Sequence, residues 1–311
     1  GHWRKRHFMA DLHHLRLIQF RAAYNLPVQA AVENGIFAKY GLEVEAAYTP
    51  GSDFLIAGLE QGKFEIGHPA ADDVVAAVEG KADCDLFLFM GLHSGLLSLV
   101  AGPGYRDVQT LRGQTLGVDS RNTGFVFLLE KFLRFRGFAP QDYRLVEIGG
   151  WEFRHRALLE KKIAATLLTS PYIEDAVDSG CHLLARDREI QPVYQATCGA
   201  ASRAWARDHE ELLVQYLRAY LEATRWCFDP ANRDACLRIL KQHMGLDSKR
   251  GAIALARLLD PRHGLYPDAA LNIPGLAAVI ELRAEMGRLA APLPVVDKYI
   301  DPSYYKKAVA T

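Results

Sequence analysis

The 311-residue sequence lacks the features of several specialised protein classes. No uninterrupted apolar run approaches the roughly 18 residues that a membrane-spanning helix needs. The 37 lysines and arginines balance 37 aspartates and glutamates, so no net charge attracts nucleic acid. A complete P-loop, a Gly-x-Gly-x-x-Gly signature and a His-Glu-x-x-His motif are all missing. The sequence therefore predicts an ordinary globular protein with no nucleic-acid partner, no cofactor and no metal site.

Cysteine is also scarce. The five cysteines form an odd number at irregular spacing, and no Cys-x-x-Cys pair suggests zinc or a redox motif. At most two disulfides could form, and the simpler interpretation is five buried small apolar side chains, which favours a reducing compartment. These residues are Cys84, Cys181, Cys198, Cys227 and Cys236.

The N-terminus leaves two locations open. Gly1-His2 looks like a cleavage scar, and residues 3–8 are basic but lack the apolar stretch of a signal peptide. Either an export signal was trimmed, in which case the protein is periplasmic or lipid-anchored, or Met9 is the natural start and the protein is cytoplasmic.

At this length we expect about two domains or lobes. Short apolar runs alternate with amphipathic segments up to about residue 208, which predicts parallel strands covered by helices. We expect strands at residues 15–20, 42–46, 64–67, 86–90, 116–118, 143–148 and 164–168. We expect helices at about residues 26–37, 54–61, 73–78, 125–135, 153–160 and 172–178.

The pattern changes after residue 208. Residues 212–228, 232–243 and 276–288 have helical apolar spacing, and no strong strand signal returns. We expect this helical tail to pack on the sheet of the first lobe.

Several motifs occur in an order that resembles a known family. The sequence resembles the type 2 periplasmic-binding-protein superfamily, in the branch of sulfonate, nitrate and taurine receptors and thiamine-pyrimidine-synthase-like proteins. The resemblance extends from about Leu15 to Tyr305. Its marks are Asn25-Leu26-Pro27, the run Glu33–Leu42, Gly62–Gly67, Leu111–Asp119, Val146–Gly150 and the late Trp205.

This resemblance implies an α/β fold of two lobes with a helical C-terminal extension. Residues 12–100 and 196–311 would form lobe I, and residues 101–195 would form lobe II. Crossing strands near residues 97–102 and 195–201 would join the lobes, and a ligand would lie in the cleft, closed by a hinge motion. The implied partners are a small organic ligand and the membrane subunit of an ABC transporter.

Loops that follow parallel strands are the first candidates for ligand contact, because helix N-termini there present free N–H groups. After the first strand come Arg21, Tyr24 and Asn25, a cation, an aromatic ring and an amide. An arginine at this place suits a carboxylate or sulfonate, although a solvated arginine beside a packed tyrosine fits as well. Ser52 follows the second strand and could donate to a ligand or only cap a helix.

Two later loops of the first lobe carry histidine. His68 could contact a ligand or be structural, and the adjacent Asp72 and Asp73 are most simply a helix cap or first-turn acids. His93 and Ser94 follow the apolar strand at 86–90, but a lone His-Ser pair is weak evidence for a nucleophile.

In the second lobe the loop at residues 119–124 is the strongest candidate. Its members Ser120, Arg121, Asn122 and Thr123 place hydroxyls, an amide and a cation directly before a helix, which suits an anion. The competing interpretation assigns Asp119 and Ser120 to capping and leaves Arg121 in solvent.

The opposite wall offers a flexible backbone and aromatic rings. Gly150 allows a close backbone approach, while Trp151 and Tyr172 could stack on a planar ligand or belong to the core.

The leading interpretation is a solute-binding protein of an ABC-type importer that holds a small organic anion or an aromatic or sulfonate-type ligand, with no catalytic residue. The alternative is a cytoplasmic enzyme on the same fold, for pyrimidine synthesis, decarboxylation or desulfination. Cys198 is a possible cleft residue for it, but nothing beside it in sequence activates a thiolate. A third possibility is an effector-sensing domain, which would need a partner with the DNA-binding element.

Overall fold

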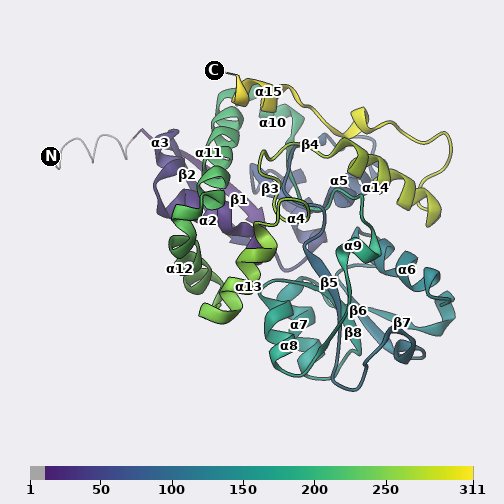
Figure 1. Cartoon of the computed structure of the whole chain (residues 1–311). Coiled ribbons are helices and arrows are strands. Elements are labelled where there is room, and N and C mark those ends of the chain that lie inside the picture. Colours follow the sequence, from purple (N-terminus) through teal and green to yellow (C-terminus); the bar gives the residue numbers. More distant parts are fainter. Residues whose placement is uncertain (1–10, 311) are drawn as a thin grey trace.

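The structure is a computed structural model that describes residues 11–310. The predictions on Gly1-His2, the basic stretch and Met9 lie outside the described residues. Two five-stranded sheets form the centres of two lobes, which we call the first and second lobe (Figure 1). Within residues 11–310 no helix is both long and apolar enough to span a membrane.

The first sheet has the strand order β2-β1-β3-β10-β4. Strand β1 pairs in parallel with both β2 and β3, whereas β10 runs antiparallel to β3 and β4. All six residues of β4 are buried, as expected for an apolar strand with helices on both faces. The strands are β1 (His13–Gln19), β2 (Leu42–Tyr48), β3 (Ile66–His68), β4 (Leu86–Gly91) and β10 (Cys198–Ser202).

The second sheet has the order β7-β6-β8-β5-β9. Strand β6 pairs in parallel with β7 and β8, and β5 runs antiparallel to β8 and β9. The strands are β5 (Leu97–Ala101), β6 (Thr115–Val118), β7 (Arg144–Glu147), β8 (Ala165–Thr169) and β9 (His182–Arg186). In both sheets the antiparallel strand, β5 or β10, follows a passage of the chain between lobes. The expectation of parallel pairing is wrong for β4, whose one neighbour in the sheet is the antiparallel β10.

Helices cover both sheets. Those between strands are α2 (Leu26–Glu33), α3 (Ile36–Lys39), α4 (Ser52–Glu60), α5 (Ala71–Gly80), α6 (Phe125–Phe135), α7 (Trp151–Leu159), α8 (Tyr172–Asp178) and α9 (Asp187–Ile190). The helices after β10 are α10 (Arg203–Asp208), α11 (Glu210–Phe228), α12 (Arg233–Met244), α13 (Ser248–Leu258), α14 (Ile273–Glu285) and α15 (Ser303–Val309). Short 3-10 turns lie at Ala23–Asn25, Val108–Leu111, Pro140–Asp142, Pro230–Asn232 and Val296–Tyr299.

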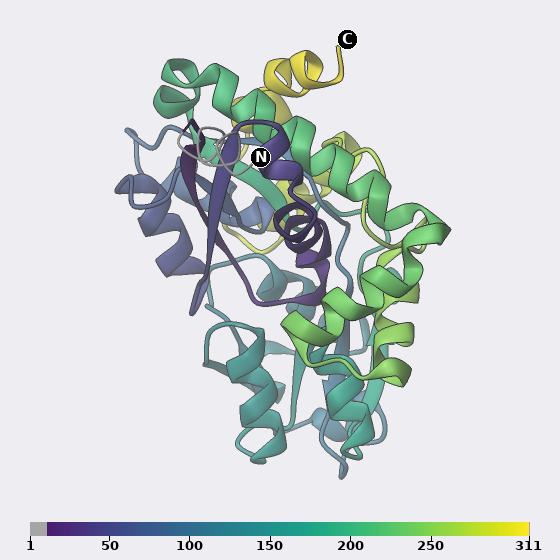
Figure 2. The ribbon, with the colours of Figure 1, turned by 90° about the vertical axis from the view of Figure 1, so that its left-hand side faces the viewer.

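The C-terminal helices pack on both lobes rather than on the first alone. Helices α11 and α12 pack against α2, as expected, but α13 contacts α8 and α14 contacts both α5 and α6. Figure 2 shows the green helices running along one side of the molecule toward the second lobe. An ion pair of 2.9 Å between Arg250 Nη1 and Asp175 Oδ1 joins α13 to α8. The tail therefore links the lobes outside the two chain crossings.

The pairing of β5 bears on where the lobes divide. A boundary between residues 100 and 101 would cut β5, whose residues all pair within the second sheet. We propose that the lobes divide in the segments 92–96 and 191–197, which connect β4 to β5 and β9 to β10. His13 and His14, expected to precede the first strand, are instead its exposed first residues.

Candidate functional site

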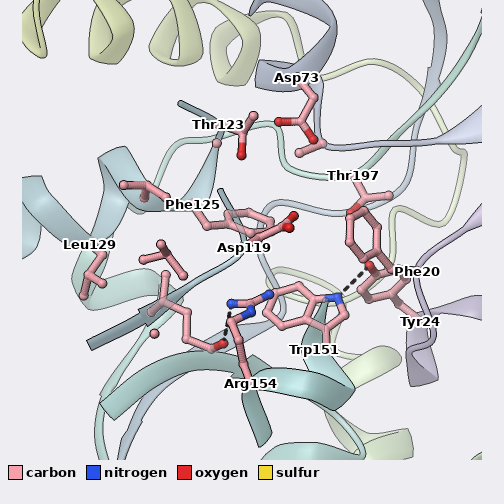
Figure 3. A pocket seen from close by; sticks show the side chains of 16 residues that line it. Phe20, Tyr24, Asp73, Asp119, Thr123, Phe125, Leu129, Trp151, Arg154 and Thr197 are labelled. Carbon is pink, nitrogen blue, oxygen red and sulfur yellow. Dashed lines mark hydrogen bonds between the residues drawn. The ribbon is translucent and has the colours of Figure 1, made fainter. Parts of the chain in front are cut away.

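A small cavity lies where the two lobes meet (Figure 3). Its volume is about 30 Å³, enough for roughly two water molecules, so a larger ligand requires the lobes to separate. Both lobes contribute to the lining, which combines aromatic rings, two carboxylates and one guanidinium. It consists of Phe20, Tyr24, Ala70, Asp73, Gly117, Val118, Asp119, Thr123, Gly124, Phe125, Val126, Leu129, Trp151, Arg154, Leu167 and Thr197.

The N-terminus of α4 in the first lobe is occupied by a carboxylate of the second lobe. The Ser52 N–H donates to Asp119 Oδ2 at 3.2 Å, and the two residues are 67 positions apart. Ser52 Oγ lies 3.4 Å from Thr123 Oγ1 in the same region. A carboxylate at a helix N-terminus is favoured by the helix dipole, so this contact stabilises the closed arrangement.

The reciprocal contact is made at the start of α6 in the second lobe. The Gly124 N–H donates to Asp72 Oδ2 of the first lobe at 2.7 Å. Arg283 Nη1 on α14 donates to the same oxygen at 2.8 Å, and both charged side chains are buried. The protein's own carboxylates therefore occupy the two helix ends that face each other across the cleft.

Aromatic side chains form one wall of the cavity. The Trp151 Nε1–H donates to the Tyr24 hydroxyl at 3.2 Å, and this bond joins the lobes (Figure 3). The Phe125 and Trp151 ring centroids are 5.5 Å apart with a tilt of 38°. Burial raises the pKa of Tyr24 to about 12, so this phenol stays neutral and available as a hydrogen-bonding group.

Arg154 is held rigidly behind the aromatic wall. Its Nε donates to the Gly149 carbonyl and its Nη1 to the Leu167 carbonyl, each at 2.9 Å. The guanidinium also lies over the Trp151 ring, 4.4 Å from the centroid. Burial lowers the pKa of Arg154, and the charge of Asp119 opposes that shift. Arg154 therefore positions Trp151 and balances Asp119.

Asp73 is the least satisfied charged group of the lining. Its side chain is 4% exposed, and its Oδ1 has no hydrogen-bond partner among the described residues. Burial, followed by the charges of Asp72 and Asp119, raises the pKa of Asp73 well above its ordinary value. Burial likewise raises the pKa of Asp119.

The structure brings three of the predicted site residues to the cavity: Tyr24, Thr123 and Trp151. Four others support the lining without forming it. Ser52 and Gly150 donate backbone N–H groups across the cleft, to Asp119 and to the Pro50 carbonyl. Asn25 Nδ2 donates to the Phe20 carbonyl, and the carbonyl of buried Ser120 accepts from Thr123.

The predicted arginines lie elsewhere. Arg21 donates to the Tyr172 hydroxyl at 3.1 Å and to the His243 carbonyl at 3.2 Å, so it links lobes outside the cavity lining. Arg121 is exposed and donates to the Leu145 carbonyl at 2.8 Å, and Asn122 beside it is also exposed.

The predicted histidines and Ser94 lie within the protein beyond the lining. His68 Nε2 is 2.8 Å from the Tyr216 hydroxyl. His93 accepts from the Gly95 N–H at 3.1 Å through Nδ1, and Ser94 Oγ is 2.6 Å from the Tyr266 hydroxyl.

Sequence reasoning missed the charged residues of the lining. Asp73 lies in the first turn of α5, as one of its two predicted roles has it, and the N-cap of that helix is Ala70. Capping by Asp119, the competing interpretation of its loop, is wrong for α6, whose N-cap is Gly124. Neither interpretation places these two carboxylates in a ligand site. Arg154 lies within α7 among other charged residues, and no local signal separates it from its neighbours.

Gly149 offers a test of closure, because its backbone has a φ of +100° and an added Cβ would lie 2.7 Å from the Pro50 carbonyl oxygen of the other lobe. We expect Gly149→Ala to destabilise the closed arrangement by about 1–3 kcal/mol beyond its backbone strain. Small-angle X-ray scattering should then give a larger radius of gyration. The matched control is Gly113→Ala, with a φ of +77° and no atom within 4 Å of the added Cβ. Equal radii for the two variants would contradict the role of Gly149.

Known proteins share this fold. The chain is similar, with 13% identity and a TM-score of 0.79, to the ligand-binding component of an ABC-type import system from Staphylococcus aureus, covering 96% of this chain and 99% of that one. The alkanesulfonate-binding protein of Xanthomonas axonopodis, bound to MOPS, gives 16% identity, coverage of 93% and 98%, and a TM-score of 0.76. The nitrate-binding protein of Synechocystis gives 14%, coverage of 96% and 88%, and a TM-score of 0.77. These likenesses establish a two-lobed periplasmic-binding-protein fold.

The sequence itself is similar to a protein of Brachyspira hyodysenteriae that is described as an ABC transporter periplasmic binding protein, with 24% identity over 217 residues. The match covers 64% of this chain and 61% of the relative. The sequence model of the NMT1-like family matches residues 13–241. The chain therefore belongs to the NMT1-like family.

Proposed function

We propose that this protein is the solute-binding component of an ABC-type importer, which closes its lobes over a small organic ligand. The observation that carries the proposal is the cavity at the lobe junction, lined by aromatic and polar side chains from both lobes. Cleft sites of this kind combine apolar walls with a few placed polar groups, and closure gives a transporter subunit a shape to recognise. A membrane-subunit partner and a periplasmic location belong to the same proposal.

The similar proteins support the proposed solute-binding role, but they do not identify the ligand. Their descriptions include an import-system component, an alkanesulfonate-binding protein and a nitrate-binding protein. A sulfonate or other organic anion was expected from Arg21 and Arg121, but neither arginine lines the cavity. An aromatic body fits the rings of Phe20, Tyr24 and Trp151 better than a small inorganic ion does.

The enzyme alternative receives less support from this geometry. Its candidate nucleophile, Cys198, is fully buried in β10 and lies outside the cavity lining, and burial raises the pKa of its thiol. A thiol of that kind is an inert packing group. The five cysteines are free, and the prediction that they are buried small side chains is confirmed for four of them and wrong for Cys84, which is half-buried.

The proposed function is tested by identifying a ligand. Native mass spectrometry of the freshly purified protein should detect a bound small molecule, and thermal-shift screening should include sulfonates, aromatic carboxylates, pyrimidines and nitrate. A ligand that binds only the folded state stabilises it by about 2.7 kcal/mol at 100 times its Kd, so the melting temperature should rise with ligand concentration. Chemical turnover of a captured ligand would contradict a pure binding role.

A further inference from the structure

We infer, on the basis of the proposed function, that the ligand presents a cationic or hydrogen-bond-donating nitrogen group to Asp73 and a planar body to the aromatic wall. The inference concerns the chemical class of the ligand. It differs from the organic anion expected from the loops, and it is argued from the contacts of Asp72, Asp119, Arg154 and Arg283 and from the unpartnered Oδ1 of Asp73.

The helix ends that would hold an anion are already occupied. Asp119 accepts the Ser52 N–H at the start of α4, and Asp72 accepts the Gly124 N–H directly before α6. An anionic ligand bound at either place would compete with a protein carboxylate when the lobes close and would then face it at short range. Like charges in a poorly hydrated cleft repel strongly, so these helix ends do not favour a second negative group.

The arginines near the cavity also have partners within the protein. Among the described residues that line the cavity, Arg154 is the one arginine, and it donates to the carbonyls of Gly149 and Leu167. Arg283, which reaches Asp72 at 2.8 Å, is buried outside the lining. Both guanidinium groups therefore have carbonyl or carboxylate partners within the protein.

Asp73 is the carboxylate of the lining with a buried oxygen that has no partner among the described residues. Its side chain lines the cavity, is 4% exposed, and makes no hydrogen bond among residues 11–310 through Oδ1. Figure 3 shows Asp73 and Thr123 on one side of the space, with Arg154 and Trp151 on the other. Burying a carboxylate without a donor is unfavourable, and a ligand N–H group would remove that penalty.

The charges and shapes of the lining agree with this assignment. When Asp73 and Asp119 are both ionised, Arg154 balances only one of them, so the lining retains one negative charge. The ring faces of Trp151 and Phe125 attract cations as well as flat apolar bodies. A planar ligand with one positive charge, such as an aromatic amidinium or a protonated aminoheterocycle, satisfies both requirements.

The experiment uses two pairs of probes with matched shape and opposite charge. Benzamidinium is compared with benzoate, and guanidinium at low concentration is compared with nitrate, by calorimetry and thermal shift on the full chain at neutral pH. We expect benzamidinium to bind and to stabilise the protein, with guanidinium weaker and both anions without effect.

Variants assign the binding to Asp73. Asp73→Asn is expected to weaken benzamidinium binding at least tenfold, because the neutral amide provides no charge and directs two donors at the ligand. The matched control is Asp53→Asn, which removes an exposed carboxylate in the first turn of α4 and should change the affinity less than twofold. Asn has nearly the shape of the Asp73 carboxyl group and carries no charge to be buried, so the Asp73→Asn variant should remain folded.

The outcomes separate the inference from the proposed function. Failure of benzamidinium to bind, equal binding to wild type and Asp73→Asn, or a co-purifying ligand without a basic or donor nitrogen would each overturn the inference. If any of these occurs while another small molecule binds the cleft, the proposed function stands. If no molecule co-purifies and no screened compound of any charge stabilises the protein, both fail.

Discussion

Replacing Arg283 by alanine is expected to lower the free energy of unfolding by about 3–5 kcal/mol, because the change leaves the Asp72 carboxylate buried without its counter-charge. Asp72 is 1% exposed and Arg283 6% exposed, and their ion pair measures 2.8 Å. Burial raises the pKa of Asp72, and Arg283 and the Gly124 N–H oppose that shift. Without Arg283, Asp72 would either remain charged beside Asp73 or take up a proton, and both outcomes cost stability.

The same change should loosen the junction of the lobes. Arg283 on α14 pairs with α5 of the first lobe and lies 5.2 Å from the centroid of the Phe127 ring on α6 of the second lobe. Urea denaturation at neutral pH gives the loss of stability from the midpoint and slope.

Two further variants serve as controls for the stability loss expected of Arg283→Ala. Arg288 is exposed and lies 5.8 Å from the centroid of the same Phe127 ring, so Arg288→Ala should cost no more than about 1 kcal/mol. Adding Asp72→Asn to Arg283→Ala should restore part of the loss, because the uncompensated charge is then absent. A cost for Arg283→Ala as small as that of Arg288→Ala would show that the buried pair contributes little.

His68 is expected to make the protein less stable as the pH falls. The ring is 1% exposed, Nε2 lies 2.8 Å from the Tyr216 hydroxyl, and the Tyr216 and Tyr220 rings surround it at 6.1 and 6.0 Å. Burial lowers the pKa of His68 to about 3, whereas an unfolded chain has a histidine pKa of about 6.5.

The sign of the effect follows from proton uptake. Below about pH 6.5 the unfolded state binds a proton that the native state does not, so each further pH unit costs about 1.4 kcal/mol until about pH 3. The contribution is therefore complete above pH 6.5 and has decreased by about 3 kcal/mol at pH 4. Buried Asp73, with its raised pKa, acts in the opposite direction over part of this range, so the wild-type profile alone is a mixture.

A comparison of variants isolates the histidine. His68→Gln keeps a side chain that can bond the Tyr216 hydroxyl but does not titrate. The stability difference between wild type and His68→Gln should decrease by about 3 kcal/mol from pH 6.5 to pH 4. His13→Gln, which removes an exposed histidine at the start of β1, should show no comparable change. A difference for His68→Gln that stays constant with pH would contradict the buried neutral histidine.

Parts of the fold were readable from local patterns. The bounds predicted for residues 125–135 and 172–178 are confirmed in α6 and α8. The buried positions of α6 recur at helical spacing, and Gly137 follows the end of the helix with a φ of +86°. The apolar spacing and the glycine that ends the helix therefore indicate the same bounds. Strand β9 was missed because most of its residues are only half-buried, and α13 was missed although Asp247 caps it by accepting the Arg250 N–H.

Part of the site could also be predicted from local sequence patterns. Tyr24, Thr123 and Trp151 were selected because each follows a strand in a loop or at a helix start, and all three line the cavity. The prediction that these loops bind an anion could not anticipate that the protein supplies the anions itself. Arg154 was invisible because its partners, the carbonyls of Gly149 and Leu167, are set by how α7 packs on β8.

By itself, the sequence determined the alternation of strands and helices, and hence the loops that could meet in a cleft. Those features depend on residues close together along the chain, whose periodicity and turn chemistry act locally. Only the tertiary structure decided which carboxylate each helix end receives, because Asp119 reaches Ser52 across 67 positions and Asp72 reaches Gly124 across 52. That choice depends on how two lobes dock, and it leaves Asp73 as the unpaired charge of the cavity.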